Sequence, residues 1–386
     1  MSLIRMIPIT VIAACATVAA VPLRADTGQT IPEAMIEEMI SLSGTITYLE
    51  GDAPGLILGA IKGDTVVVEG FGETARGNGI TPDGDTVFRI GSITKVFAGE
   101  MLAHAVARGE VAFTDPVAPL LADPLGAAAA QHPDIRLIDL ATHSGGLPRE
   151  VPRAESPDSD PFRTITPDAF ADWLQGNALQ FAPGRGSAYS NFGFDLLSAA
   201  LSTAGGASYP DLLADRITRP LALNDTTFTP TAGMAERQMI GHAPDGEALP
   251  IVPTGAVITG SGGLYSTAND LLRWMRWHLD ETGPDAQVRL LDHAVYLPRD
   301  GLETVVSMDE SGRMDAMGLG WVAMNATAES PFYLQKSGAL QGQMSYIAFA
   351  PQYDAAVLIT MNQYDFGAAA GMTEAANALL RTLSGY

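Results

Sequence analysis

Hydrophobic residues cluster in short runs near both ends of the chain. Four of these runs are rich in aliphatic and β-branched side chains, at residues 55–62, 65–72, 345–350 and 355–361. Gly63 and Asp64 separate the first two runs, and Pro351 lies between the last two, so each pair predicts two adjacent strands joined by a turn. The apolar pattern then changes to helical periodicity over residues 372–383, which predicts a closing helix.

The middle of the chain, from about residue 110 to 250, has a different pattern. It is rich in alanine and leucine, and helical runs such as 167–174 and 194–204 are separated by loops containing proline and glycine. Strands at both ends with helices between them predict an α+β fold, in which one antiparallel sheet from both chain ends is flanked by helices and carries an inserted, mainly helical lobe. The expected limits are an α/β lobe at about 26–110 and 251–386 and a helical lobe at about 111–250.

The first residues have the composition of a secretory signal peptide. Arg5 precedes an apolar stretch from about Met6 to Val21, and the small residue Ala25 comes before polar sequence resumes. The apolar stretch is short and alanine-rich for a membrane span. We therefore predict a signal peptide at residues 1–25, which is removed from the mature chain.

Charge and cysteine content narrow the setting further. The 44 acidic and 22 basic residues give a net charge of −22, which argues against a nucleic-acid partner because phosphate binding needs a basic surface. Cys15 is the only cysteine, so an internal disulfide is excluded. Export without disulfides predicts a periplasmic protein. A lipid anchor on Cys15, with weak membrane association, is the less favoured alternative.

Lysine is rare in this chain, and Lys62, Lys95 and Lys336 are the only examples among 386 residues. Ser92 precedes Lys95 by three positions, at the start of a stretch with helical periodicity. Positions three apart share a helix face, which brings the lysine amine within reach of the serine hydroxyl. The amine is a base only when it is neutral, and burial and neighbouring positive charge favour that state by lowering the pKa. Taken alone, Ser-x-x-Lys arises by chance in most long sequences.

Two further elements carry side chains that complement such a serine. Tyr189 and Asn191 lie two residues apart on a loop before a predicted helix, where a hydroxyl can relay a proton and an amide can bind a substrate amide. The alternative is a helix-capping loop with Asn191 as N-cap. Lys336, Ser337 and Gly338 precede an apolar strand, where an ammonium and a hydroxyl can bind an anionic substrate and glycine lets its backbone lie close. The alternative is a solvated lysine at a strand edge.

The order Ser-x-x-Lys, Tyr-x-Asn, Lys-Ser-Gly resembles the signature of the penicillin-recognising serine hydrolases, the superfamily of penicillin-binding proteins and serine beta-lactamases. Five further stretches look most like the AmpH-type D-alanyl-D-alanine carboxypeptidase/endopeptidases: DLATHSGGLPRE (139–150), AYSNFGFDLLSAAL (188–201), ITRPLALNDTTFTP (217–230), TGSGGLYSTANDLLRWM (259–275) and DAMGLGWVAM (315–324). The similarity implies a beta-lactamase/transpeptidase-like fold, with residues 26–386 as a single catalytic domain.

The resemblance also implies a role for each motif residue. The implied catalytic residues are the nucleophile Ser92, its general base Lys95 and the proton relay Tyr189. The implied substrate-binding residues are Asn191, Lys336, Ser337, Gly338 and Ala339, with the backbone NH groups of Ser92 and Ala339 as oxyanion hole. The chain departs from the AmpH-type pattern at Leu340 and Gln341, which replace a glycine-rich run and leave the preference on the leaving-group side open.

The implied reaction is cleavage of D-Ala-D-Ala in peptidoglycan stem peptides, and of cross-links, through an acyl-enzyme and without a cofactor. Beta-lactam antibiotics are the implied inhibitors. A beta-lactamase or an esterase of the same superfamily remains an alternative, although many of these esterases lack a lysine at the place of Lys336. A catalytically inactive penicillin- or peptidoglycan-binding protein is an alternative of another class. It is disfavoured because every reactive group is present.

Other candidate motifs lack the residues that their chemistry needs. The spacing of the six histidines matches neither H-E-x-x-H nor another metal-ligand pattern, so no metal site is predicted. These histidines are at positions 104, 132, 143, 242, 278 and 293. His143 resembles a buried structural histidine of the family. Residues 260–263 (GSGG) lack the lysine of a phosphate-binding loop and predict a close approach of the backbone beside the sheet.

Overall fold

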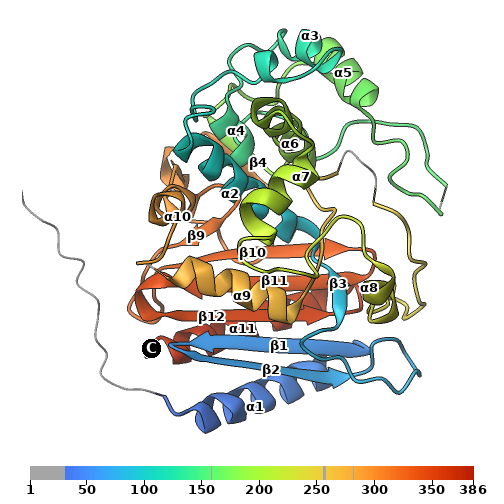
Figure 1. The fold of residues 1–386 in the computed structure, drawn as a ribbon, viewed down its shortest axis with the longest axis vertical. Helices are drawn as coiled ribbons and strands as arrows, with labels where there is room; N and C mark the ends of the chain where they lie inside the picture. Colours follow the sequence, from blue (N-terminus) through green and yellow to red (C-terminus); the bar gives the residue numbers. More distant parts are fainter. Residues whose placement is uncertain (1–30, 158, 255–257, 281) are drawn as a thin grey trace, which may run out of the picture.

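The computed structural model describes residues 31–386 except 158, 255–257 and 281. The predicted signal peptide and the lipid-anchor alternative at Cys15 lie outside the described residues. Among the helices that are described, none combines the length and hydropathy needed to cross a membrane. An eight-stranded antiparallel sheet forms the centre of the molecule, in the order β2-β1-β12-β11-β10-β9-β8-β6 (Figure 1).

The first and last strands of the chain are neighbours in this sheet, which confirms the predicted α+β fold with a sheet built from both chain ends. β1 pairs antiparallel with both β2 and β12, and Leu56 lies opposite Met361. The strands of the sheet are β1 (Gly55–Lys62), β2 (Thr65–Gly72), β6 (Leu297–Pro298), β8 (Ala316–Met317), β9 (Val322–Met324), β10 (Tyr333–Leu340), β11 (Gln343–Ala350) and β12 (Ala355–Met361).

Helices cover both faces of the sheet. α1 (Glu33–Gly51) and α11 (Phe366–Leu383) pack on one face, whereas α9 (Ala268–Leu279) lies on the other (Figure 1). Successive side chains of a strand point to opposite faces, and β1 shows this directly. Leu56 and Leu58 belong to the core under α1 and α11, and Ile57 belongs to the core that continues into the rest of the molecule.

Most of the remaining helices lie above the sheet in Figure 1, whereas α8 lies beside one end of the sheet, and many of them are short segments joined by loops. They are α2 (Thr94–Ala107), α3 (Leu125–Ala129), α4 (Leu137–Ala141), α5 (Pro167–Gly176), α6 (Asn191–Gly205), α7 (Tyr209–Leu213), α8 (Ala232–Glu236) and α10 (Ala286–His293). Two small sheets link segments that are distant in sequence. They are β3 (Val87–Arg89) with β5 (Tyr265–Thr267), and β4 (Gly186–Ala188) with β7 (Thr304–Val306). The predicted lobe limits near residues 110 and 251 stay a prediction.

Candidate active site

Ser92 lies on a tight turn that packs directly against β10. A 3-10 turn over Gly91–Ile93 precedes α2, so the α-helix begins two residues after the serine. Gly91 has a φ of +51°, and a Cβ at this position would lie 2.6 Å from the Ala339 nitrogen. A Cβ on Gly338 would collide with the Ile90 carbonyl oxygen. Both glycines are therefore needed for the serine turn and the strand to meet.

This packing modifies one sequence-based expectation and agrees with another. Gly338 was expected to let a substrate backbone lie close, but its close neighbour is the protein's own turn, including the Ser92 nitrogen at 2.9 Å from the position of a Cβ. The backbone nitrogens of Ser92 and Ala339 both lie at the junction of turn and strand. The two NH groups of the expected oxyanion hole are thus brought to the same place.

Lys95 is fully buried in the first turn of α2, with its amine beside Ser92. Its Nζ lies 3.1 Å from Ser92 Oγ, and donates to Asn191 Oδ1 and to the Ser261 carbonyl oxygen at 2.6 Å each. A neutral amine has two hydrogens and one lone pair. The two short bonds can take the hydrogens, which leaves the lone pair facing the serine hydroxyl.

The surroundings of Lys95 favour that neutral state. Burial is the main cause that lowers the pKa of Lys95 well below its usual value, followed by the positive charge of Lys336. Asp195 and Glu150 act in the opposite direction, and Arg149 adds to the lowering. Both conditions required of a lysine base, burial and nearby positive charge, are therefore present.

The Tyr189 ring lies close to three basic side chains. The Lys95 and Lys336 nitrogens lie 4.9 and 5.1 Å from the centre of its ring, and the Arg149 guanidinium carbon lies at 4.6 Å. Burial raises the pKa of Tyr189, while a hydrogen bond with Ser92 works against that rise. The phenol therefore keeps its proton at neutral pH, as a residue that passes a proton onward requires.

His143 positions the loop that carries Tyr189. Its ring stacks on the Tyr189 ring with centroids 4.5 Å apart, and its Nδ1 accepts a hydrogen bond from the Ser190 backbone nitrogen at 3.0 Å. Burial lowers the pKa of His143 well below its usual value, so the imidazole is neutral. These contacts are those of a buried structural histidine.

Asn191 connects Lys95 to the rim of the site. Ser190 rather than Asn191 caps α6, because the Ser190 hydroxyl accepts from the Gly193 nitrogen at 2.9 Å. The N-cap alternative for Asn191 is therefore wrong. Its amide oxygen faces Lys95, and its amide nitrogen donates to Glu150 at 2.5 Å. The amide is thus fixed in orientation at the edge of the site.

Lys336 lies on β10 with its amine near the Tyr189 ring, and is 4% exposed. Burial lowers its pKa to about 8, because the negative charge of Glu310 offsets only part of the burial effect. The amine is mostly charged at neutral pH and donates to the Ser337 carbonyl oxygen at 3.0 Å. It lines a narrow pocket together with Tyr189 and Ser337. The alternative of a solvated lysine at a strand edge does not hold.

The chain is similar to known proteins over most of its length. A model of the Beta-lactamase family matches residues 30–381. The chain belongs to the beta-lactamase family.

Individual members of the beta-lactamase family resemble the chain over most of its length. The D-alanyl-D-alanine-carboxypeptidase/endopeptidase AmpH of Escherichia coli K12 is 36% identical over 86% of this chain and 86% of its own. A beta-lactamase of the same strain is 26% identical over 76% of this chain and 79% of its own. The solved structure of a beta-lactamase/D-alanine carboxypeptidase from Yersinia pestis, complexed with citrate, matches with a TM-score of 0.82 and 34% identity, over 92% of this chain and 99% of that chain.

Two residues that the family motifs do not include determine where Lys95 lies. The Ser261 carbonyl oxygen accepts from Lys95, and Ser261 donates from its nitrogen and its hydroxyl to the two carboxyl oxygens of Asp195, at 3.0 and 2.9 Å. Asp195 is buried on α6, one helical turn after Asn191. The sequence indicated only a close backbone approach at 260–263. The Ser261 group that binds Lys95 is a backbone carbonyl, which no residue type signals. Asp195, which holds Ser261 in place, was therefore missed as well.

An ion pair at the rim was also missed. Arg149 donates to Glu310 at 2.9 Å, and both side chains are about half exposed. Arg149 also covers the Tyr189 ring. These residues come from loops 161 positions apart in the sequence, so no local pattern could have indicated their contact.

The departure at Leu340 and Gln341 lies at the end of β10 and in the turn that follows. Gln341 and Gly342 have φ values of +49° and +73°, as a two-residue hairpin turn requires. A Cβ on Gly342 would lie 2.5 Å from the His242 nitrogen, so the turn packs against the segment at residues 241–242.

Proposed function

We propose that the chain is a serine D,D-peptidase that cleaves D-Ala-D-Ala in peptidoglycan stem peptides through an acyl-enzyme. Ser92 Oγ attacks the carbonyl carbon between the two D-alanines, and its proton moves to the neutral amine of Lys95. Tyr189 passes a proton to the departing amine, and the bond to the terminal D-alanine breaks. Water then hydrolyses the Ser92 ester and regenerates the enzyme.

Binding groups around the nucleophile complete the proposed mechanism. The NH groups of Ser92 and Ala339 stabilise the oxyanion of the tetrahedral intermediate. Asn191 orients the substrate amide. The charged amine of Lys336, with the hydroxyl of Ser337, binds the terminal carboxylate of the substrate. The same chemistry on a cross-link that ends in a free carboxylate would make the enzyme an endopeptidase.

The observation that carries this proposal is the pairing of two lysines with opposite tasks. Lys95 is buried with its amine 3.1 Å from the Ser92 hydroxyl and a lowered pKa that favours the neutral base, and Lys336 lies near the Tyr189 ring with a pKa of about 8. A nucleophile with its base accounts for acylation by any hydrolase of the family. A second, charged amine accounts for a substrate with a free carboxylate.

The similarity to AmpH of Escherichia coli, whose name describes a D-alanyl-D-alanine-carboxypeptidase/endopeptidase, supports the same choice. A beta-lactamase is the second candidate, because a relative of that name matches the chain and shares the acylation chemistry. An esterase and an inactive penicillin- or peptidoglycan-binding protein remain as outcomes of the test.

We also propose the setting in which this activity takes place. Residues 26–386 would be one catalytic domain that acts in the periplasm after removal of a signal peptide at 1–25. The substrates there are the stem peptides of peptidoglycan, and beta-lactam antibiotics are inhibitors that acylate Ser92. The composition of the first residues and the acidic charge of the whole chain support this setting.

The experiment that tests the function compares three substrates of the purified protein. These are a pentapeptide ending in D-Ala-D-Ala, nitrocefin and a short-chain p-nitrophenyl ester. We expect release of D-alanine from the pentapeptide with the highest kcat/KM, and loss of turnover of all three in Ser92→Ala. Dominant turnover of nitrocefin would show a beta-lactamase, and dominant turnover of the ester an esterase. Acylation by penicillin without turnover of any substrate would show a binding protein.

A further inference from the structure

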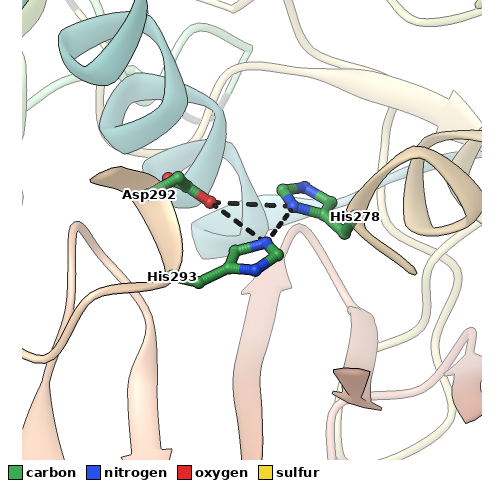
Figure 2. A group of neighbouring side chains, drawn as sticks. All are labelled: His278, Asp292 and His293. Atoms are coloured by element: carbon green, nitrogen blue, oxygen red, sulfur yellow. Dashed lines mark hydrogen bonds and ion pairs between the residues drawn. The ribbon is translucent and has the colours of Figure 1, made fainter. Parts of the chain in front are cut away.

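A second group of titratable side chains is buried near Glu100 of α2. His278 is in the last turn of α9, and Asp292 and His293 end α10 (Figure 2). The two helix ends bring the three side chains together, although the histidines are 15 positions apart. Sequence spacing did not indicate this group. Known metal-binding motifs place their ligands at fixed spacings on one helix, whereas these residues come from the ends of two helices.

Three atoms of this cluster, which we call the His-Asp-His cluster, face one another. His278 Nδ1 lies 2.9 Å from His293 Nε2, and Asp292 Oδ2 lies 3.7 and 4.0 Å from these two nitrogens. In a tetrahedral zinc site with bonds of about 2.0–2.2 Å, ligand atoms are separated by roughly 3.4 Å. The three separations lie on both sides of that value, so small side-chain rotations would complete a three-ligand site.

The surroundings of the His-Asp-His cluster are those of a metal ligand set. Glu100 of α2 places Oε2 at 3.9 Å from His278 Nε2, the ring nitrogen on the far side from the cluster. Ligating histidines commonly donate their second ring nitrogen to a carboxylate, which fixes the tautomer. Trp321 donates to Asp292 Oδ2 at 2.8 Å, as expected for a supported carboxylate ligand.

Unpaired polar atoms provide a separate indication. Asp292 Oδ1, His278 Nε2 and Glu100 Oε1 are buried and have no hydrogen-bond partner among the described residues. Buried polar atoms without a hydrogen-bond partner are rare and call for an explanation, such as a bound ion or water. The three atoms are not the facing atoms of the cluster, so they indicate uncompensated polarity around it rather than ligand positions. Both acids are 0% exposed. Burial lowers the pKa of both histidines, and the positive charge of Arg289 lowers it further. The Arg289 guanidinium also lies over the Trp277 ring.

We propose that His278, Asp292 and His293 form a binding site for one divalent transition-metal ion of the zinc type, with Glu100 supporting His278. Imidazole nitrogens together with one carboxylate suit Zn²⁺ and its analogue Co²⁺. The ion joins the ends of α9 and α10, where the helix dipoles favour positive charge. Its role is structural, because its ligands come from α9 and α10, and it acts on α2 only indirectly, through His278 and Glu100, five positions beyond Lys95.

The test uses the purified chain without a histidine tag, treated with EDTA, desalted and then supplied with ZnCl₂. We expect one Zn²⁺ per chain to remain after a second desalting step, measured by elemental mass spectrometry, and the midpoint of thermal unfolding to rise by a few degrees. CoCl₂ should produce visible absorption bands of a histidine-ligated tetrahedral ion. His293→Gln should remove the retained zinc and the bands. Glu100→Gln should weaken zinc binding about 10–100-fold.

His132→Gln is the matched control, because His132 bonds to the Leu174 carbonyl oxygen, away from the cluster. This variant should bind zinc as the parent protein does. Labelling by a fluorescent penicillin shows which variants keep their fold. The proposal is overturned if the parent protein retains no zinc and shows no cobalt bands, or if His293→Gln retains as much zinc as His132→Gln.

Discussion

The two sides of α2 differ in how completely their polar groups are paired. On the side of Ser92, each hydrogen of the Lys95 ammonium has an acceptor, and the neutral amine would also be satisfied. Around Glu100, by contrast, three buried polar atoms have no hydrogen-bond partner in the part of the chain that the structure describes. The Lys95 amine is satisfied by protein groups alone, although His143 Nε2 on the same side is buried without a hydrogen-bond partner. The group around Glu100 combines unpaired acceptors with a set of side chains that could bind a cation.

This difference between the two regions shows which kind of site can be found from sequence motifs and which cannot. The reactive side contains residue types at short, fixed spacings, because a base must reach its nucleophile from the next turn of the same helix. The other side is assembled by the packing of α9 and α10 against α2. Substitutions on the reactive side should therefore change rates more than stability, and substitutions around Glu100 should do the reverse.

The largest effect is expected for Lys95→Ala. Removal of the base should lower the rate constant of acylation by a fluorescent penicillin by about 10³-fold or more, with a folded protein by circular dichroism. Lys62→Ala is the matched control, because Lys62 donates to the Tyr353 carbonyl oxygen far from Ser92. An acylation rate of Lys95→Ala equal to that of Lys62→Ala would contradict the role of the base.

Lys336→Ala should separate two kinds of substrate. The loss of a charge-assisted hydrogen bond costs about 1.5–3 kcal/mol, so kcat/KM for a peptide with a free carboxylate should fall about 10–100-fold. A neutral ester should change by less than about threefold, since it lacks the carboxylate that the amine binds. Steady-state kinetics on both substrates is the measurement. Equal losses would remove the reason to prefer a peptidase.

The pH dependence of kcat/KM should show the same distinction without a substitution. Lys336 is charged below its pKa of about 8 and neutral above it, so activity on the carboxylate substrate should decline as the pH rises through that value. Lys95 has a pKa well below its usual value, so its base form persists on the alkaline side. Activity on the ester should not decline near pH 8. If kcat/KM declines at the same alkaline pH for the peptide and the ester, the assignment of this decline to Lys336 is wrong.

Asp195→Ala should have a moderate effect that acts through Ser261. Two donors of Ser261 lose their acceptor, and the carbonyl oxygen that binds Lys95 shifts. We expect about a tenfold decrease in the acylation rate, since an unsatisfied buried donor costs about 1–3 kcal/mol. Asp195→Asn keeps an acceptor and should restore most of the rate. If Asp195→Ala and Asp195→Asn have the same acylation rate, a positioning role of Asp195 is excluded.

The smallest effect on rate is expected for Glu100→Ala. The Trp274 indole, which donates to Glu100 at 2.7 Å, loses its acceptor and a small cavity forms. Urea unfolding should show a loss of roughly 2 kcal/mol in the free energy of unfolding. Acylation by penicillin should stay within about twofold at a temperature where the variant is folded. A large loss of acylation with unchanged stability would invert the comparison between the two sides of α2.

The sequence predicted the long strands from the two chain ends well because these strands have strong local signals. The runs at 55–62 and 65–72 form strands with these bounds, since their apolar residues flank a Gly63-Asp64 turn. α1 was not predicted. Its buried positions include Gly44 and Thr47, which do not stand out as an apolar stripe. Strands such as β8 have only two residues, and their pairing depends on tertiary contacts.

The same reasoning explains which site residues were found. Ser92, Lys95, Tyr189 and Lys336 belong to motifs whose spacing follows from local geometry. The structure brings them together, with the Lys95 amine beside the Ser92 hydroxyl and both lysine amines near the Tyr189 ring. Glu150, Asp195 and Glu310 enter the site through contacts between distant segments. Their carboxylates are common surface residues by type, so only the folded chain distinguishes them.

The most direct test of the proposed catalytic site is to locate the acyl group after brief reaction with penicillin. Trypsin would release residues 90–95 between Arg89 and Lys95, and mass spectrometry would find the adduct there. The account predicts one penicilloyl group per chain, on Ser92 and absent from Ser92→Ala. A folded protein that stays unmodified, or that carries the adduct on another residue, would contradict it.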